Sequence, residues 1–324
     1  MKISELISSR PHKTGFSFEV LPPLKGKSIE HLFKNIDVLM QFDPLYINIT
    51  THRSELVFKS TADGLYQKVS ERNRPGTVAV AAAIQQKYGI PAVPHIICSG
   101  FSKTETEHAL IDLNFLGINN LLVLRGDKAK HENRYIPVEN GHMHACELAE
   151  QINNFNNGFF TDGTKMDISN NNRFSFGVAG YPEKHEEAPN IEVDLKMLKH
   201  KVDSGADYIV TQMFFDNSVF YNFLYRIREK GITIPVLPGI MPVTNGKQIA
   251  RSCQLSGAVL PSRFRAIVDK FGDNPKAMQQ AGIAYATDQI IDLIANGIQN
   301  IHVYSMNKPE VAAAIMSNLS EIVK

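Results

Sequence analysis

The run FSFEVLP, Phe16 to Pro22, has the alternation of a β-strand and carries one acid in an otherwise mostly apolar segment. Successive side chains of a strand point to opposite sides, so Phe16, Phe18 and Val20 share one face and Glu19 lies on the other. If the second face points into the fold, loss of water raises the pKa of Glu19 and makes it a plausible general acid near neutral pH. The alternative is a structural carboxylate paired with a neighbouring Lys or Arg.

Seven further runs of this kind follow, each separated from the next by a stretch with helical spacing. Alternating strands and helices imply parallel strands with crossover helices, and eight such units close naturally into an α/β fold, a (β/α)8 TIM barrel. An open, doubly wound sheet is the main alternative. The seven runs are Tyr46 to Thr50, Ala92 to Cys98, Leu121 to Asp127, Phe174 to Tyr181, Tyr208 to Phe214, Pro235 to Met241 and Ile301 to Met306.

Two connections are longer than a minimal barrel needs. Residues 52–91, after the second strand, have room for two extra helices, the second being Thr77 to Tyr88. Between the fourth and fifth strands, Asn153 to Asn172 is a polar, Asn-rich insertion and predicts an exposed loop. Neither stretch has the composition of an interdomain hinge, so we expect residues 1–324 to form a single catalytic barrel domain.

The charge balance argues against a nucleic-acid or membrane partner. Lys plus Arg number 34 and Asp plus Glu 33, which leaves no basic field for a phosphate backbone or an anionic bilayer. Met1 to Arg10 lacks the apolar stretch of a signal peptide, and the longest aliphatic run, Val78 to Ile84, is too short to cross a membrane. We expect a cytoplasmic protein whose partners are small molecules or further subunits. Three widely spaced cysteines are expected to be reduced, small core residues: Cys98, Cys146 and Cys253.

Polar residues gather where the predicted strands run out into loops, which is the end of a barrel that carries chemistry. The sequence places a polar or turn-forming group at all eight positions, and we expect the active site there. These groups are Glu19, Thr50 with His52, His95, Arg125 with Asp127, Tyr181 with His185, Gln212, Pro238 with Gly239, and Tyr304 with Asn307.

Other patterns carry less weight. No GxGxxG is present, so a dinucleotide-binding Rossmann fold has no phosphate loop. His142 and His144 lack a carboxylate or cysteine at ligand spacing, which favours a solvated pair over a metal site, and we expect no metal.

Taken in order, the motifs resemble those of the methylenetetrahydrofolate reductase family, and the resemblance spans nearly the whole chain. The motifs are FSFEVLPP at 16–23, PHIIC at 94–98, LRGD at 124–127, GYPEKHEEA at 180–188, DLKMLKHKVDSGADYIVTQMFFD at 194–216, PGIMPVTNGKQ at 238–248 and HVYSMNK at 302–308. The resemblance implies a (β/α)8 barrel that binds FAD at the carboxyl ends of its strands. It also implies a ping-pong cycle in which NADH or NADPH reduces the flavin and a reduced folate then takes the hydride.

The resemblance also implies roles for particular residues. Glu19 is the acid that protonates N10 of the folate, and Asp127 contacts the pterin and tunes the flavin. Folate-binding residues are Gln212, Gln248, Tyr304 and Lys308. FAD-binding residues are Thr50, His95, Arg125, Gly126, Asp127, Tyr181, His185, Ala188, Asp194 and Lys201.

The chain departs from the family pattern at three places. Lys308 stands where many bacterial relatives have Arg, Ser252 stands where a stacking aromatic is expected, and His144 takes the place of a flavin-contacting Tyr. The sequence leaves open the choice between NADH and NADPH. A homo-oligomer is expected because relatives form dimers or tetramers.

Three other functions are alternatives for such a chain. A proline dehydrogenase-like flavoenzyme would share the barrel but needs no acid at Glu19, and a Schiff-base aldolase needs an inward lysine that the predicted strands lack. A non-catalytic binding or assembly protein on a retained barrel would be colourless.

Overall fold

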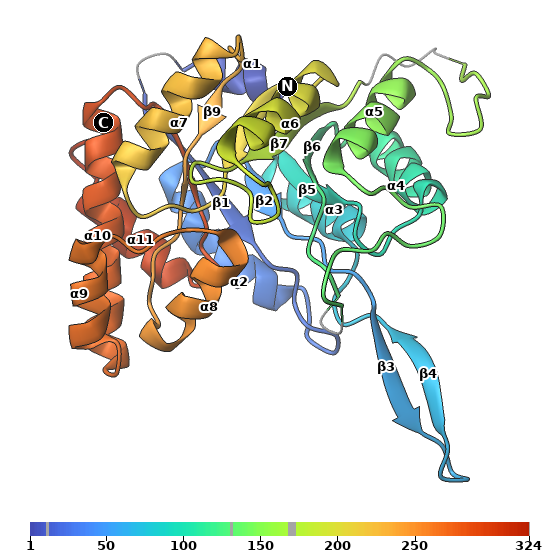
Figure 1. Cartoon of the computed structure of the whole chain (residues 1–324), viewed down its shortest axis with the longest axis horizontal. Helices are drawn as coiled ribbons and strands as arrows, with labels where there is room; N and C mark the ends of the chain where they lie inside the picture. The colour runs from blue at the N-terminus through green and yellow to red at the C-terminus, as the bar shows by residue number, and fades with distance from the viewer. Residues whose placement is uncertain (11–12, 130–131, 168–172, 324) are drawn as a thin grey trace.

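The computed structural model describes residues 1–10, 13–129, 132–167 and 173–323, and its central feature is a parallel sheet curved into a barrel (Figure 1). Neighbouring strands follow the order β10-β11-β1-β2-β5-β6-β7-β8-β9. All eight predicted strands are present. Their bounds are β1 Gly15–Val20, β2 Ile47–Ile49, β5 Ala92–Ile97, β6 Asn120–Leu124, β7 Ser175–Gly180, β8 Tyr208–Thr211, β9 Val236–Leu237, β10 Gly239–Ile240 and β11 Asn300–Val303.

The predicted seventh strand is split at Pro238 into β9 and β10, and this split brings the barrel close to closure. β9 pairs with β8 through Val210 and Leu237, whereas β10 pairs with β11 through Gly239 and His302. Proline has no N–H to give to a ladder, but the Pro238 carbonyl accepts a hydrogen bond from the His302 amide at 2.9 Å. Residues 236–240 therefore pair with β8 at one end and with β11 at the other. This arrangement confirms a barrel and excludes the open sheet.

Helices surround the barrel and bury the outward faces of the strands (Figure 1). Within the described ranges no helix is both long and apolar enough to cross a bilayer. The helices are α1 Ile3–Ser8, α2 Glu30–Leu39, α3 Thr77–Tyr88, α4 Lys103–Phe115, α5 Ala145–Asn156, α6 Ile191–Asp203, α7 Asn217–Glu229, α8 Gly246–Ser256, α9 Ser262–Phe271, α10 Pro275–Ala295 and α11 Pro309–Asn318, with a short 3-10 helix at Met40–Phe42.

A second apolar cluster fills the inside of the barrel toward the amino ends of the strands. Tyr46, Tyr208 and Leu237 belong to it and are fully buried. Ile3 of α1 packs into the same cluster, and its amide donates to the Asn120 side chain at 3.0 Å. This end of the barrel is therefore filled and covered, which leaves the carboxyl ends for polar groups.

The prediction of two helices after the second strand was wrong for the first of them. An antiparallel hairpin, β3 Glu55–Ser60 and β4 Tyr66–Glu71, stands there and projects from the body of the molecule (Figure 1). Its strands pair Val57 with Val69, and Gly64 turns the chain with φ of 80°. β-Branched residues around an Asp-Gly turn favour a hairpin. Only α3 occupies the remainder of the connection as a helix.

The Asn-rich insertion begins later than predicted. α5 continues to Asn156, so residues 153–156 are helical and not part of a loop. Asn156 fixes this helix end, because its side chain bonds both the amide and the carbonyl of Phe174, at 2.8 and 2.9 Å. Residues 157–167 form the loop, with a single bridge between Phe159 and Lys165. The last part of the predicted loop, 168–172, lies outside the described residues.

Gly177 tests how tightly the barrel interior is filled. A Cβ at Gly177 would stand 2.3 Å from the ring of Tyr208, which is fully buried and donates its hydroxyl to the Leu121 carbonyl. We expect Gly177→Ala to lower the free energy of unfolding by about 1–3 kcal/mol, measured by urea unfolding. Adding Tyr208→Leu should recover part of the loss, since the shorter side chain frees the clashing volume. If the two changes were simply additive, the close-packing argument would fail.

Candidate functional site

Glu19 points into the barrel near the carboxyl end of β1 and is 8% exposed. Burial raises the pKa of Glu19 from 4.5 to about 8. In the described part of the chain no Lys or Arg forms a salt bridge with it, so the structural ion pair considered from sequence is not found. The Ser305 hydroxyl donates to the Glu19 carbonyl at 2.5 Å and ties β1 to the loop after β11. Glu19 is therefore a neutral carboxylic acid at pH 7.

His95, on β5, lies beside this acid. Its Nε2 is 3.6 Å from Oε2 of Glu19 and has no hydrogen-bond partner in the structure. Burial lowers the pKa of His95 to about 3, so the imidazole is neutral. Because both groups are uncharged near pH 7, their contact is not an ion pair. A buried ring nitrogen without a partner is unusual, and it leaves one polar group of the site free to bond a ligand.

Tyr304 and Gln212 directly follow β11 and β8, and Tyr304 lies close to Glu19 because β11 pairs with β1. The Tyr304 hydroxyl donates to the Thr211 carbonyl at 2.6 Å, directly before Gln212. Burial and the nearby Glu19 both raise the pKa of Tyr304, so its hydroxyl stays protonated. The Gln212 side-chain oxygen accepts from the Met213 amide at 2.8 Å. Strands distant in sequence thus place an acid, a phenol and an amide at one end of the barrel.

The turn after β6 carries a second, charged part of the site. The Arg125 guanidinium forms two bonds to the Glu187 carboxylate, one of them at 2.9 Å, and lies over the Tyr135 ring at 4.8 Å from its centroid. Gly126 has φ of 80°, which suits glycine. The Ser99 hydroxyl donates to the Asp127 carbonyl at 2.6 Å. The turn is therefore braced on both sides of the glycine.

Five predicted FAD-binding residues form one cluster on the loop after β7 and on α6. The His185 amide donates to Oδ2 of Asp194 at 3.0 Å, and the His185 and Tyr181 rings meet edge to face at 4.7 Å. Lys201 lies 5.6 Å from the Tyr181 ring centroid. Its Nζ donates to the Ala179 carbonyl at 2.6 Å, and burial lowers its pKa to about 8. Ala188 joins the cluster through its amide, which donates to the His185 carbonyl at 3.0 Å.

These groups suit a nucleotide-like cofactor that carries a diphosphate. Arg125 and Lys201 supply positive charge, and Nε of Arg125 is buried without a hydrogen-bond partner. Asp194 is 8% exposed and supplies an acceptor next to them. The planar guanidinium group of Arg and the ammonium group of Lys are the usual partners of phosphate oxygens. The donor set therefore fits FAD without a glycine-rich loop.

The remaining predicted residues lie at the rim. Thr50 Oγ1 is 3.2 Å from Nε2 of His52. The pKa of His52 is lowered, mainly by burial, although the charge of Asp127 partly opposes this effect. Lys308 Nζ donates to the Thr244 hydroxyl at 2.6 Å. Gln248 is exposed on the first turn of α8, and among the described residues no hydrogen bond joins its side chain to Gln212.

Several residues that hold the site were not predicted. Arg53 donates to the Ser99 hydroxyl at 3.1 Å, and Ser99 in turn braces Asp127. Glu187 pairs with Arg125. It lies within the GYPEKHEEA motif but was not predicted to belong to the site. Ser99 could have been predicted, because it is a polar residue directly after a predicted strand. Pairings such as Arg125 with Glu187, 62 positions apart, cannot be read from one sequence.

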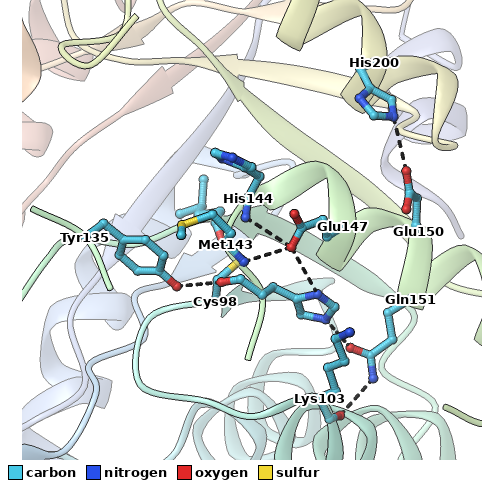
Figure 2. Close-up of polar contacts among 11 residues, drawn as sticks. Cys98, Lys103, Tyr135, Met143, His144, Glu147, Glu150, Gln151 and His200 are labelled. Atoms are coloured by element: carbon cyan, nitrogen blue, oxygen red, sulfur yellow. Dashed lines mark hydrogen bonds and ion pairs between the residues drawn. The ribbon is translucent and has the colours of Figure 1, made fainter. Parts of the chain in front are cut away.

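The interpretation of His142 and His144 as a solvated pair was wrong for His142. His142 is 3% exposed, and its Nε2 lies 2.6 Å from Oε1 of Gln151. Its carbonyl accepts from the Tyr135 hydroxyl at 2.8 Å, and Glu147 accepts from the amides of Met143 and His144, as Figure 2 shows. His142 therefore anchors the segment before α5 onto that helix. The prediction of reduced core cysteines was right for Cys98 and Cys146, which are free and buried, whereas Cys253 is free but only half-buried.

A parallel barrel with a buried acid and a charged cluster at its carboxyl end is typical of (β/α)8-barrel enzymes. Comparison with known proteins supplies the family. The profile of Methylenetetrahydrofolate reductase matches residues 2–320, and the chain belongs to this family of oxidoreductases.

Named relatives agree with this assignment. The chain is 32% identical over 333 residues to Methylenetetrahydrofolate reductase (NADH) 1 of Zea mays, covering 99% of this chain and 51% of that protein. It is 28% identical over 305 residues to 5,10-methylenetetrahydrofolate reductase of Escherichia coli (strain K12), covering 94% of this chain and 90% of that protein. The chain thus spans about half the length of the plant relatives it matches.

A solved structure shows the same fold. It is described as an uncharacterized protein from Clostridium thermocellum that binds two copies of 5-methyl-5,6,7,8-tetrahydrofolic acid. The TM-score is 0.56 at 13% identity, with 99% of both chains covered. The likeness concerns the fold.

The buried Glu19 carboxyl group predicts a particular dependence of stability on pH. A carboxyl whose pKa is higher in the folded chain contributes stability that is fully present below pH 4.5 and is lost as pH rises toward 8. Glu19→Gln stays neutral, so its melting temperature relative to the parent should rise across this window and level off above it. Calorimetry at several pH values measures this, with Glu229→Gln at an exposed site on α7 as control. A flat difference from pH 4.5 to 8 would show that Glu19 is not desolvated.

Proposed function

We propose that this chain reduces 5,10-methylenetetrahydrofolate to 5-methyltetrahydrofolate with electrons from NADH or NADPH, using FAD in a ping-pong cycle. The observation that carries the proposal is the buried carboxyl of Glu19 at the end of a barrel in this family, with no Lys or Arg salt bridge among the described residues and a pKa raised by burial to about 8. When bound, FAD would accept a hydride from the nicotinamide and pass it to the exocyclic methylene carbon of the folate.

Glu19 supplies the proton that this reaction needs. As the five-membered ring of the folate opens, the bond from the methylene carbon to N10 breaks and N10 keeps the electron pair. The Glu19 carboxyl donates its proton to N10, and the carbon, now an iminium at N5, takes up the hydride as a methyl group. An acid with a pKa near the working pH donates well and is readily reprotonated. The unpaired Nε2 of His95, 3.6 Å away, adds a neutral polar group beside the acid.

Other residues hold the cofactor and substrate. Arg125 and Lys201 would neutralise the diphosphate, and Asp194 would accept from ribose or adenine groups. Asp127 would contact the pterin from the braced turn after β6. Gln212 and Tyr304, which directly follow β8 and β11, would bond the folate ring, while Gln248 and Lys308 at the rim would meet its outer part.

The competing functions fit the site less well. A flavoenzyme that oxidises an amine by hydride abstraction has no use for a protonated carboxyl at Glu19. A Schiff-base aldolase needs a reactive inward lysine on a strand. Lys201, whose pKa of about 8 would suit that chemistry, lies on α6 with its ammonium on the Ala179 carbonyl. A non-catalytic protein would not require an acid with a raised pKa.

The first test is the colour of the protein. Purified with FAD, the chain should be yellow and should bleach when NADH or NADPH is added without oxygen. Methylenetetrahydrofolate should then restore the visible absorption of the oxidised flavin. Running both nucleotides side by side decides the donor. Bleaching without recovery would leave only a general flavin reductase.

The second test separates the two half-reactions. Glu19→Gln should bind flavin and be reduced by NAD(P)H at nearly the parental rate, because neither step needs the proton. Folate reduction should fall by about 10²–10⁴-fold, the usual contribution of a general acid. Stopped-flow absorbance measures each half-reaction, with Glu229→Gln as the matched control. Parental folate reduction by Glu19→Gln would rule out the acid assignment.

A further inference from the structure

The loop between β7 and α6, residues 181–190, is held together by the ammonium group of Lys184. Its Nζ donates to the carbonyls of His185 at 2.9 Å, Glu186 at 3.2 Å and Ala188 at 2.5 Å. An ammonium has three donors, and here all three go to main-chain oxygens of its own loop. Lys184 is thus directed inward, unlike most surface lysines.

The backbone at Lys184 is strained in a way that this arrangement explains. Lys184 has φ of 131°, which residues other than glycine rarely adopt. Such a conformation persists only where the surroundings hold it. Contacts on both sides do so: Oε1 of Glu183 accepts from the Val259 amide at 2.9 Å, and the His185 amide donates to Asp194 at 3.0 Å. The strained residue, Lys184, is therefore held on both sides by the hydrogen bonds of its neighbours Glu183 and His185.

The residues that follow Lys184 reach the charged part of the site. His185 packs on Tyr181 and bonds Asp194, and Glu187 holds the Arg125 guanidinium. The Glu187 amide also donates to Nδ1 of His185 at 3.1 Å. The positions of His185, Glu187 and Ala188 therefore depend on the turn whose carbonyls Lys184 binds.

We propose that Lys184 is a positioning residue for the flavin: its ammonium fixes the 185–188 turn so that His185, Ala188 and the Glu187–Arg125 pair are in place when FAD binds. This inference rests on the proposed function, because it takes FAD as the ligand. Lys184 itself need not touch the cofactor. Its effect is to lower the ordering cost of binding, since a loop fixed beforehand loses less freedom when the ligand arrives.

The test compares Lys184→Met with the parent protein. Methionine keeps a long unbranched side chain but has no donors. We expect FAD to bind at least about tenfold more weakly to the apoprotein, the change associated with losing one charged hydrogen bond, as measured by quenching of flavin fluorescence. The melting temperature of the apoprotein should change little, because the loop lies outside the core. Amide exchange in residues 181–190 should become faster.

Two further variants fix the interpretation. Lys184→Arg keeps donors for the carbonyls and should bind FAD within about threefold of the parent, whereas Lys196→Met, at an exposed site on α6, should have no effect. If the parent binds FAD and Lys184→Met binds it equally tightly, the positioning role is refuted and the proposed function stands. A parent protein that binds no flavin would overturn both.

Discussion

The structure around the site depends on the burial of one carboxyl group without a counter-ion. Ionising Glu19 would place a charge among apolar and aromatic side chains, so burial holds it in the protonated form. The same desolvation keeps His95 uncharged and the Tyr304 hydroxyl protonated. One half of the site is therefore electrically neutral near pH 7, although every group in it can donate or accept a hydrogen bond.

The other half carries the charge. Arg125, Glu187, Asp194 and Lys201 lie on the turn after β6, the loop after β7 and α6, where opposite charges adjoin. Separating the two halves has a chemical consequence, because a cation close to Glu19 would lower its pKa and weaken it as an acid. A diphosphate needs cations, and a proton donor needs their absence. The barrel satisfies both by using different strands.

Much of the fold could be predicted because its signals are local. All eight strands follow from their short β-branched runs, and alternation alone separates Glu19 from the face shared by Phe16, Phe18 and Val20. The hairpin at Glu55–Glu71 was missed even though Asp63-Gly64 is a common turn signal, because a barrel connection is expected to be helical. The end of α5 was misplaced because Asn156 is held by Phe174, 18 positions away, and helix propensity does not report such a bond.

The site was less predictable, because its geometry is made by pairs that are distant in sequence. The residues at the strand ends could be predicted from the sequence, but their partners could not. The Ser305 hydroxyl binds the Glu19 carbonyl, and Asn307 bonds both the amide and the carbonyl of Leu21, 286 positions away. The burial of His142 was equally hidden, since Gln151 becomes its partner only when α5 forms. The contacts of Ser305 and Asn307 depend on barrel closure, whereas that of His142 depends on the α5 helix.

The lack of a glycine-rich phosphate loop follows from the same architecture. In a Rossmann fold one turn and one helix amino end bind the diphosphate, so a short contiguous motif suffices. Here the candidate ligands come from Arg125 on one strand end, from the 181–188 loop and from Lys201 on α6, and only the barrel brings them together. Each of these residues taken alone is of a kind found in any protein. The family is recognisable from sequence only when the separate motifs are taken in order, and the interactions of the 181–188 loop are what bring three distant segments together at the candidate site.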